Sequence, residues 1–181
     1  RPWQGVPAIE RAANGRLWCA VMTGGLTEPT IENYVTLTTR AADETAWAPL
    51  TMAVPPVHDA RTYDGALWHD PTGRLWLFYN QASLVSGRFG VWFRTTADAT
   101  GPTPCWSAPR EIPLGVPFAF RLNKPTVLST GEWLLPVTWA RETPRRWWWP
   151  AGEQLQGVAI STDQGETRAL HGAIEAPRWA L

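Results

Sequence analysis

The sequence has few of the features that would point to several common classes of protein. Its two cysteines, Cys19 and Cys105, lie far apart and show no metal-ligand spacing, so no metal site is predicted. The formal net charge is zero and no basic patch stands out, which argues against nucleic acid as the main partner. No hydrophobic run is long enough to span a membrane, so we predict no membrane partner.

Long amphipathic helices are also missing from the pattern, because no segment sustains an apolar period of roughly 3.6 residues. The chain is rich instead in proline, glycine and tryptophan, with 17, 15 and 13 residues. Many prolines and glycines agree with short strands separated by turns. Each tryptophan can bury about 150–250 Å² between packed sheets, so we interpret most of them as structural. These features predict an all-β fold.

A short phrase recurs three times along the chain. Gly15-Arg16-Leu17-Trp18 is followed 58 residues later by Gly73-Arg74-Leu75-Trp76, and 58 residues after that by Gly131-Glu132-Trp133-Leu134. Each copy begins in a tight polar turn, typical of a β-hairpin loop, between two apolar runs. Equal spacing of this size is typical of repeat architectures.

Each repeat is predicted to form a four-stranded antiparallel sheet. First strands are expected at 6–9, 65–68 and 125–128, second strands at 17–22, 75–79 and 133–139, third strands at 34–39, 90–95 and 157–161, and short fourth strands near Trp47 and Trp106. Four short strands repeated radially describe a β-propeller. We predict one domain over residues 1–181, with blades at about 1–57, 58–115 and 116–181.

Three blades are fewer than the ~4–8 that close a propeller. We therefore expect a partial propeller, completed by other blades. Either the chain belongs to a longer polypeptide that supplies the remaining blades, which we favour, or copies of the chain associate to complete the ring.

One turn resembles a known motif. The segment 161–167 reads Ser-Thr-Asp-Gln-Gly-Glu-Thr, similar to the Asp-box of sialidase-like propellers, with Arg168 where that motif ends in tryptophan. Segments 4–10, 32–35 and 123–128 are also similar to bacterial sialidase-family, or BNR-repeat, proteins. The resemblance covers nearly the whole chain and corresponds to the N-terminal half of such a protein. It implies a propeller fold, a structural role for the Asp-box and activity on carbohydrate.

One departure from the family bears on activity. Sialidases carry an Arg-Ile-Pro type motif on the first strand, and its arginine helps to clamp the carboxylate of sialic acid. When the proline of that motif is aligned with Pro7, Gly5 stands in the place of the arginine. A bidentate contact between arginine and a carboxylate is hard to replace. The resemblance therefore implies the fold, with another exo-acting glycosidase, a polysaccharide lyase or a non-catalytic protein as the function.

Topology predicts where a site would lie. Loops between second and third strands share one face with the links into first strands, and both are longer and chemically richer than the turns opposite. The candidate catalytic residues on this face are Glu32, His58, Asp59, Tyr63 and Asp64. The candidate substrate-binding residues are Gln4, Asn33, Arg61, Asn80, Gln81, Arg121, Asn123, Lys124 and Arg141. Glycoside hydrolysis usually uses two carboxylates, whereas the resemblance implies a tyrosine activated by a glutamate, for which Tyr63 and Glu32 are available.

Each candidate also has a structural interpretation. Asp59, Asp64 and Glu32 could equally form salt bridges with Arg61 or Lys124, and His58 could be an ordinary surface histidine. The run from Arg145 to Pro150 is either a sugar-stacking loop, in which arginine lies over indole, or a contact with another blade or subunit.

The leading prediction is a sialidase-fold, exo-acting glycoside hydrolase on a glycan, an acidic one if the arginines bind a carboxylate. No cofactor is implied. The alternatives are a non-catalytic glycan-binding or scaffolding propeller, and an inactive half-propeller.

Overall fold

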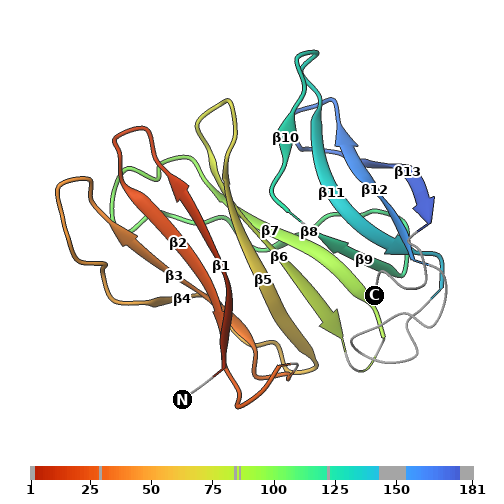
Figure 1. Cartoon of the computed structure of the whole chain (residues 1–181), viewed down its shortest axis with the longest axis horizontal. Coiled ribbons are helices and arrows are strands. Elements are labelled where there is room, and N and C mark those ends of the chain that lie inside the picture. The colour runs from red at the N-terminus through yellow and green to blue at the C-terminus, as the bar shows by residue number, and fades with distance from the viewer. Residues whose placement is uncertain are drawn as a thin grey trace. The chain divides into compact units, whose positions relative to one another are not determined.

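The computed structural model describes residues 3–28, 30–83, 85, 87–121, 123–142 and 154–175. Within these ranges the chain forms strands and connecting loops (Figure 1). The described residues contain no helix, and hence none that could cross a membrane. The all-β prediction is therefore confirmed for this part of the chain. Two compact units divide the chain, Arg1–Gln81 with Trp92–Arg110 and Ala82–Val91 with Glu111–Leu181.

The first unit begins with a four-stranded antiparallel sheet in which the strands pair in chain order. Its strands are β1 (Gln4–Arg11), β2 (Leu17–Thr23), β3 (Tyr34–Arg40) and β4 (Thr51–Val54). The first phrase of the repeat closes the β1–β2 hairpin, where Gly15 has a φ of 86° that favours glycine. The fourth strand was predicted near Trp47. It forms further along the chain, because the ladder with β3 begins at Thr51.

The second group of strands follows the same hairpin pattern. It comprises β5 (Ala60–His69), β6 (Leu75–Ser83) and β7 (Phe89–Thr96), which neighbour one another in that order, and β8 (Arg110–Glu111), which pairs with β7. The predicted strand near Trp106 is replaced by this two-residue strand a little further on. The tip of the β6–β7 hairpin belongs to the second unit, and the rest of β5, β6 and β7 to the first.

The second unit contains the third copy of the repeat. Its strands are β9 (Phe118–Arg121), β10 (Thr126–Val127), β11 (Trp133–Ala140), β12 (Leu155–Ser161) and β13 (Ala169–Glu175). Both β9 and β10 pair with β11 on the same side, so together they form one interrupted strand, and β9 also pairs in parallel with the start of β7. On the other side β12 pairs with β11, and β13 with β12. The predicted first strand of this repeat therefore begins earlier than expected, in β9.

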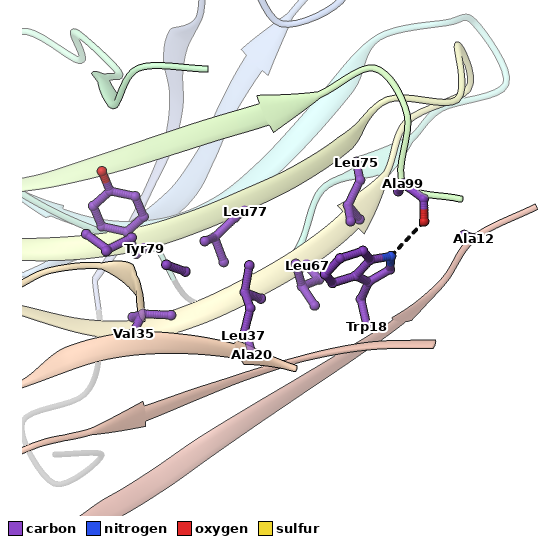
Figure 2. Packing of buried hydrophobic residues seen from close by; sticks show 12 residues of the cluster. Ala12, Trp18, Ala20, Val35, Leu37, Leu67, Leu75, Leu77, Tyr79 and Ala99 are labelled. Carbon is purple, nitrogen blue, oxygen red and sulfur yellow. Dashed lines mark hydrogen bonds between the residues drawn. The ribbon is translucent and has the colours of Figure 1, made fainter. Parts of the chain in front are cut away.

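The core of the first unit lies between the sheet of β1–β4 and the strands β5 and β6. Strands β1, β2 and β3 all lie against β5. Trp18 and Ala20 of β2 face Leu75 and Leu77 of β6, and the indole N–H of Trp18 donates a hydrogen bond to the carbonyl oxygen of Ala99 at 2.9 Å (Figure 2). Fully burying one large apolar side chain stabilises a fold by about 1.5–3 kcal/mol. Packing of two sheets face to face is therefore the main stabilising contact of this unit.

The turn between β5 and β6 is organised by a buried carboxylate. Asp70 Oδ1 accepts hydrogen bonds from the backbone N–H and hydroxyl of Thr72 and from the backbone N–H of Arg74, at 2.7–3.0 Å. Asp70 Oδ2 accepts from Arg74 Nε and from Trp76 Nε1, both at 2.8 Å. Burial of the carboxylate acts to raise its pKa, but these hydrogen bonds outweigh burial and hold the pKa below its ordinary value. The turn is therefore fixed by one ionised side chain.

Replacing Asp70 with asparagine is expected to lower the free energy of unfolding by about 1.5–3 kcal/mol, because an amide NH₂ would face two donors that now bind Oδ2. The wild-type advantage should shrink as the pH falls below the ordinary pKa of aspartate, since the depressed pKa stabilises the fold only where the unfolded chain is ionised. Urea unfolding across this pH range measures both effects. Asp43→Asn is the control, because Asp43 is an exposed carboxylate in the connection between β3 and β4.

The core also contains a buried hydroxyl. Tyr79 of β6 is fully buried, and its Oη finds no hydrogen-bond partner among the described residues. Burial raises the pKa of Tyr79 to about 12, partly opposed by the positive charge of Arg94. An unpartnered hydroxyl in a core costs stability relative to a methine of the same shape.

Tyr79→Phe is therefore expected to leave stability unchanged or to raise it by up to ~1 kcal/mol at neutral pH. In the wild type the raised pKa means that stability is complete below pH ~10 and falls as the pH rises toward about 12. That loss should be smaller in the phenylalanine variant. Urea midpoints at neutral and alkaline pH test this, and a clear loss of stability in the variant at neutral pH would contradict it.

Candidate functional site

A pocket of about 810 Å³ lies in the first unit, where the β2–β3 loop meets the link between β4 and β5. Both segments belong to the face on which topology predicted a site. The pocket brings together Glu32 and His58, two of the predicted catalytic residues. Its described lining comprises Gly24, Gly25, Leu26, Ile31, Glu32, Tyr34, Pro56, Val57 and His58.

The shape of the β2–β3 loop depends on two glycines. Gly24 and Gly25 have φ values of 100° and 70°, a conformation that other residues rarely adopt. A Cβ atom on Gly24 would lie 2.1 Å from the carbonyl oxygen of Glu32, and one on Gly25 would lie 3.1 Å from Glu32 Oε2. The loop therefore folds back on itself closely enough to hold Glu32 against its first residues.

Asn33 stabilises the same loop from inside. Its side chain is completely buried, its amide nitrogen donates to the carbonyl oxygen of Gly24 at 2.8 Å, and its Oδ1 accepts from the backbone N–H of Thr30 at 3.1 Å. The carbonyl oxygen of Asn33 also accepts a hydrogen bond from the backbone N–H of Thr62 on β5 at 3.2 Å. The structure thus uses Asn33 to close the loop and to join it to the next strand.

The pocket combines two ionisable groups with an apolar wall. Glu32 and His58 are exposed, and the ring of Tyr34 is half-buried beside them. Leu26, Ile31 and Val57 add exposed aliphatic surface. Sequence reasoning did not select Tyr34 or these aliphatic residues. The sequence did contain a signal that could have pointed to them, because apolar side chains follow two glycines in this loop. A wall of this kind can hold the apolar face of a ring while the carboxylate and imidazole bind its polar groups.

Arg61 and Tyr63 of β5 form a buried pair. Arg61 is only 5% exposed, its guanidinium carbon lies 3.9 Å from the centre of the Tyr63 ring, and its NH2 lies 3.1 Å from Glu28 Oε1. Tyr63 is itself buried and is not part of the described pocket lining. Tyr63, which the family resemblance paired with Glu32, therefore lies outside the described lining of the pocket that contains Glu32.

The remaining candidates of the first unit lie on three strands and in the turn before β5. Asp59 is half-buried and follows His58 in the turn before β5. Asp64 lies within β5 with a φ of 51°. Gln4 is exposed at the start of β1. Asn80 and Gln81 lie within β6, where Asn80 is fully buried and Gln81 Nε2 donates to the hydroxyl of Thr62 at 3.0 Å.

The second unit holds the other four candidates. Arg121 is buried at the end of β9, whereas Asn123 and Lys124 are exposed in the interruption between β9 and β10. Arg141 is exposed just after β11, and its guanidinium carbon lies 5.6 Å from the centre of the Trp139 ring. The run from Arg145 to Pro150 lies outside the described residues. Within the described ranges no group of three or more His, Cys, Asp or Glu side chains is placed to hold a metal ion.

Solved structures with a similar backbone include glycoside hydrolases. A family 117 glycoside hydrolase from Zobellia galactanivorans, Zg3597, aligns with 94% of this chain at a TM-score of 0.63 and 16% identity. An endo-arabinase from Bacteroides thetaiotaomicron aligns with 94% at a TM-score of 0.62 and 13% identity. The backbone of this chain is therefore similar to part of these β-propeller folds. A protein of unknown function from Dyadobacter fermentans also aligns, with 98% of the chain, at a TM-score of 0.76 and 12% identity.

At these identities the likeness is one of fold alone. The chain spans 56%, 55% and 61% of the Dyadobacter, Zobellia and Bacteroides chains. No protein-family model and no curated protein matches the sequence.

The sialidase-like resemblance of the turn at 161–167 therefore stays a prediction, although hydrogen bonds hold that turn in place. Thr167 donates its backbone N–H and its hydroxyl to Asp163, Ser161 donates its hydroxyl to Asp163 Oδ1, and these bonds lower the pKa of Asp163 to about 2.

Asn33→Ala is expected to lower the free energy of unfolding by about 1–3 kcal/mol, because two buried backbone groups would lose their partners. The β2–β3 loop should also become more sensitive to proteolysis. Urea unfolding and limited proteolysis measure these effects. Gln4→Ala, at an exposed position at the start of β1, is the control and should change stability by less than ~0.5 kcal/mol. Equal behaviour of the two variants would show that Asn33 does not hold the loop.

Proposed function

We propose that the chain is a carbohydrate-active protein that binds a glycan in the pocket between the β2–β3 loop and the β4–β5 link. The observation that carries the proposal is the placement of Glu32 and His58 in one pocket beside Tyr34. The likeness of the fold to glycoside hydrolases supports the choice of carbohydrate as the ligand.

The composition of the pocket suits a sugar. Small-molecule pockets typically measure about 300–1,000 Å³ and combine a mostly apolar lining with a few polar groups. A sugar ring has an apolar face that can lie on Tyr34 and hydroxyl groups that can bind a carboxylate or an imidazole. Glu32 would accept hydrogen bonds from two hydroxyls, and His58 would donate or accept one according to its tautomer.

For catalysis we propose exo-acting hydrolysis with Glu32 and Asp59 as the two carboxylates. Hydrolysis of a glycosidic bond usually needs one carboxylic acid to protonate the leaving oxygen and one carboxylate to act as nucleophile or base. Glu32 lies in the pocket, and Asp59 is next in sequence to the pocket residue His58. Asp59 would reach the substrate from the turn that His58 shares.

A second candidate function is glycan binding without turnover. It is favoured by one observation, that Glu32 is the only carboxylate in the described lining of the pocket. A single carboxylate is enough to bind sugar hydroxyls but is one short of the usual hydrolytic pair.

The experiment uses the full chain and a panel of neutral and acidic oligosaccharides, with calorimetry for binding and chromatography for released sugars. Glu32→Gln should weaken binding about tenfold and, if the protein hydrolyses a glycan, should lower the rate by about 10²–10⁴. His58→Ala should weaken binding with a smaller effect on rate. Asp43→Asn, an exposed carboxylate in the β3–β4 connection, is the matched control and should behave as the wild type.

The results separate the two functions. Turnover that is lost in both Glu32→Gln and Asp59→Asn supports hydrolysis, whereas binding without turnover in the wild type supports the second function. A wild-type chain that neither binds nor cleaves any member of the panel would contradict both.

A further inference from the structure

Two adjacent residues of β5 hold the β2–β3 loop, which supplies one wall of the pocket. The loop lies at the end of the first sheet where β5 begins (Figure 1). Arg61 donates a hydrogen bond from its side-chain NH2 to Glu28 Oε1 at 3.1 Å. The backbone N–H of Thr62 donates to the carbonyl oxygen of Asn33 at 3.2 Å. Glu28 and Asn33 are therefore two anchors that tie this loop to neighbouring positions of one strand.

The residues between the two anchors carry part of the chemistry of the pocket. Ile31 and Glu32 lie between Glu28 and Asn33 in the sequence, and both line the pocket. The backbone N–H of Glu32 donates to the hydroxyl of Thr30 at 3.3 Å. We name residues 30–32 the pocket segment. The place of the Glu32 carboxylate depends on the path that the backbone takes between the two anchors.

Arg61 is suited to be the fixed partner of its ion pair. The residue is 5% exposed, and its guanidinium carbon lies 3.9 Å from the centre of the Tyr63 ring. Its Nε is buried and finds no hydrogen-bond partner within the described part of the chain. A planar guanidinium over an aromatic ring is a well-oriented donor. The side chain of Glu28, by contrast, is 37% exposed. The oriented partner thus belongs to the strand, and the partner that it holds belongs to the loop.

We propose that Arg61 is a positioning residue of the pocket, which holds the pocket segment and its Glu32 carboxylate in the ligand-binding geometry through the ion pair with Glu28. The inference rests on the proposed function for the identity of the ligand as a glycan. Water screens an ion pair with an exposed partner, so such a pair contributes little to the free energy of unfolding. Its main effect is on the loop that it fixes. Burial of Arg61 against Tyr63 favours this indirect role over direct contact with a substrate.

Loss of the ion pair would leave the second anchor in place. The side chain of Asn33 still binds the carbonyl oxygen of Gly24, and its carbonyl oxygen still accepts from Thr62. The loop would then be attached to β5 at one point instead of two. When the binding geometry is populated only part of the time, the apparent affinity falls by that fraction. A pocket segment that keeps its place a tenth of the time would bind about tenfold more weakly.

Hydrogen exchange of the full chain, measured without any ligand, tests the positioning. The backbone N–H of Thr30 donates to Asn33 Oδ1, and that of Asn33 donates to the carbonyl oxygen of Thr30, so exchange at these two amides reports on the pocket segment. Glu28→Gln and Arg61→Met should each speed this exchange about tenfold, because local opening becomes easier. Exchange within β2 and β3 should not change.

The two substitutions are chosen so that the chain still folds. Glutamine at position 28 keeps an oxygen that can accept a hydrogen bond, and methionine at position 61 keeps apolar contact with Tyr63 without a buried charge. Circular dichroism checks the fold of both variants. Glu142→Gln, at an exposed position in the second unit, is the matched control and should exchange as the wild type does.

Ionic strength and a double variant separate an ion pair from simple packing. Raising the ionic strength from about 0.1 M to 1 M shortens the Debye length from about 10 Å to 3 Å. Exchange at Thr30 and Asn33 should therefore become faster with salt in the wild type and change little with salt in Glu28→Gln. The double variant should exchange no faster than Arg61→Met alone, because both substitutions remove the same interaction.

Calorimetry with the same panel of neutral and acidic oligosaccharides tests the consequence for binding. Glu28→Gln should weaken binding about tenfold and leave the urea midpoint close to that of the wild type. Unchanged exchange at Thr30 and Asn33 in both variants would overturn the proposal, as would unchanged binding in Glu28→Gln. Exchange that rises equally throughout the first unit would also overturn it, since the pair would then be an ordinary structural contact. Faster exchange at these two amides alone, in a chain whose wild type binds no oligosaccharide, would support the positioning role and contradict only the proposed function.

Discussion

The structure depends on one constraint, that a sheet with two apolar faces must bury both of them. In the first unit the side chains of β2 alternate, so that Trp18 and Ala20 reach the second group of strands while Cys19 and Val21 face away. The second group shows the same alternation. Leu75 and Leu77 face the first sheet, and Trp76 and Phe78 form a buried aromatic cluster with Phe93. The two sheets that pack together in the first unit therefore stabilise each other.

The same constraint decides where chemistry can occur. Because the sheet faces are used for packing, polar groups that bind a ligand must lie at strand ends and in loops. The pocket agrees with this expectation, since its lining comes from the β2–β3 loop and the turn before β5. The loop is supported by Asn33, whose side chain closes it and whose carbonyl oxygen accepts a hydrogen bond from the backbone N–H of Thr62 on β5. The residues that pack the core and the candidate binding residues thus lie in separate parts of the first unit.

The sequence predicted the hairpins well, because their signals are local. The phrase ending in Trp18 and Trp76 identified the second strand of two repeats, and glycine marked the turn before each. The fourth strands were misplaced, since Trp47 and Trp106 lie in connections whose ladders form later. The chemistry of Asp70 was missed because its partners become neighbours only when the turn closes. The meeting of Glu32 and His58 followed from topology, whereas the burial of Arg61 against Tyr63 had no sequence signal.

A repeated distortion of the backbone bears on which carboxylates matter. Val6 and Asp64 both have positive φ, 46° and 51°, and stand 58 residues apart on β1 and β5. Strained residues often cluster at active sites, which would favour a catalytic role for Asp64. Val6, however, adopts the same conformation without any chemistry to offer, and a β-branched residue is strained there more than an aspartate. The distortion is therefore a property of the repeat and not a mark of catalysis. Glu32 and Asp59 remain the carboxylates on which hydrolysis would depend.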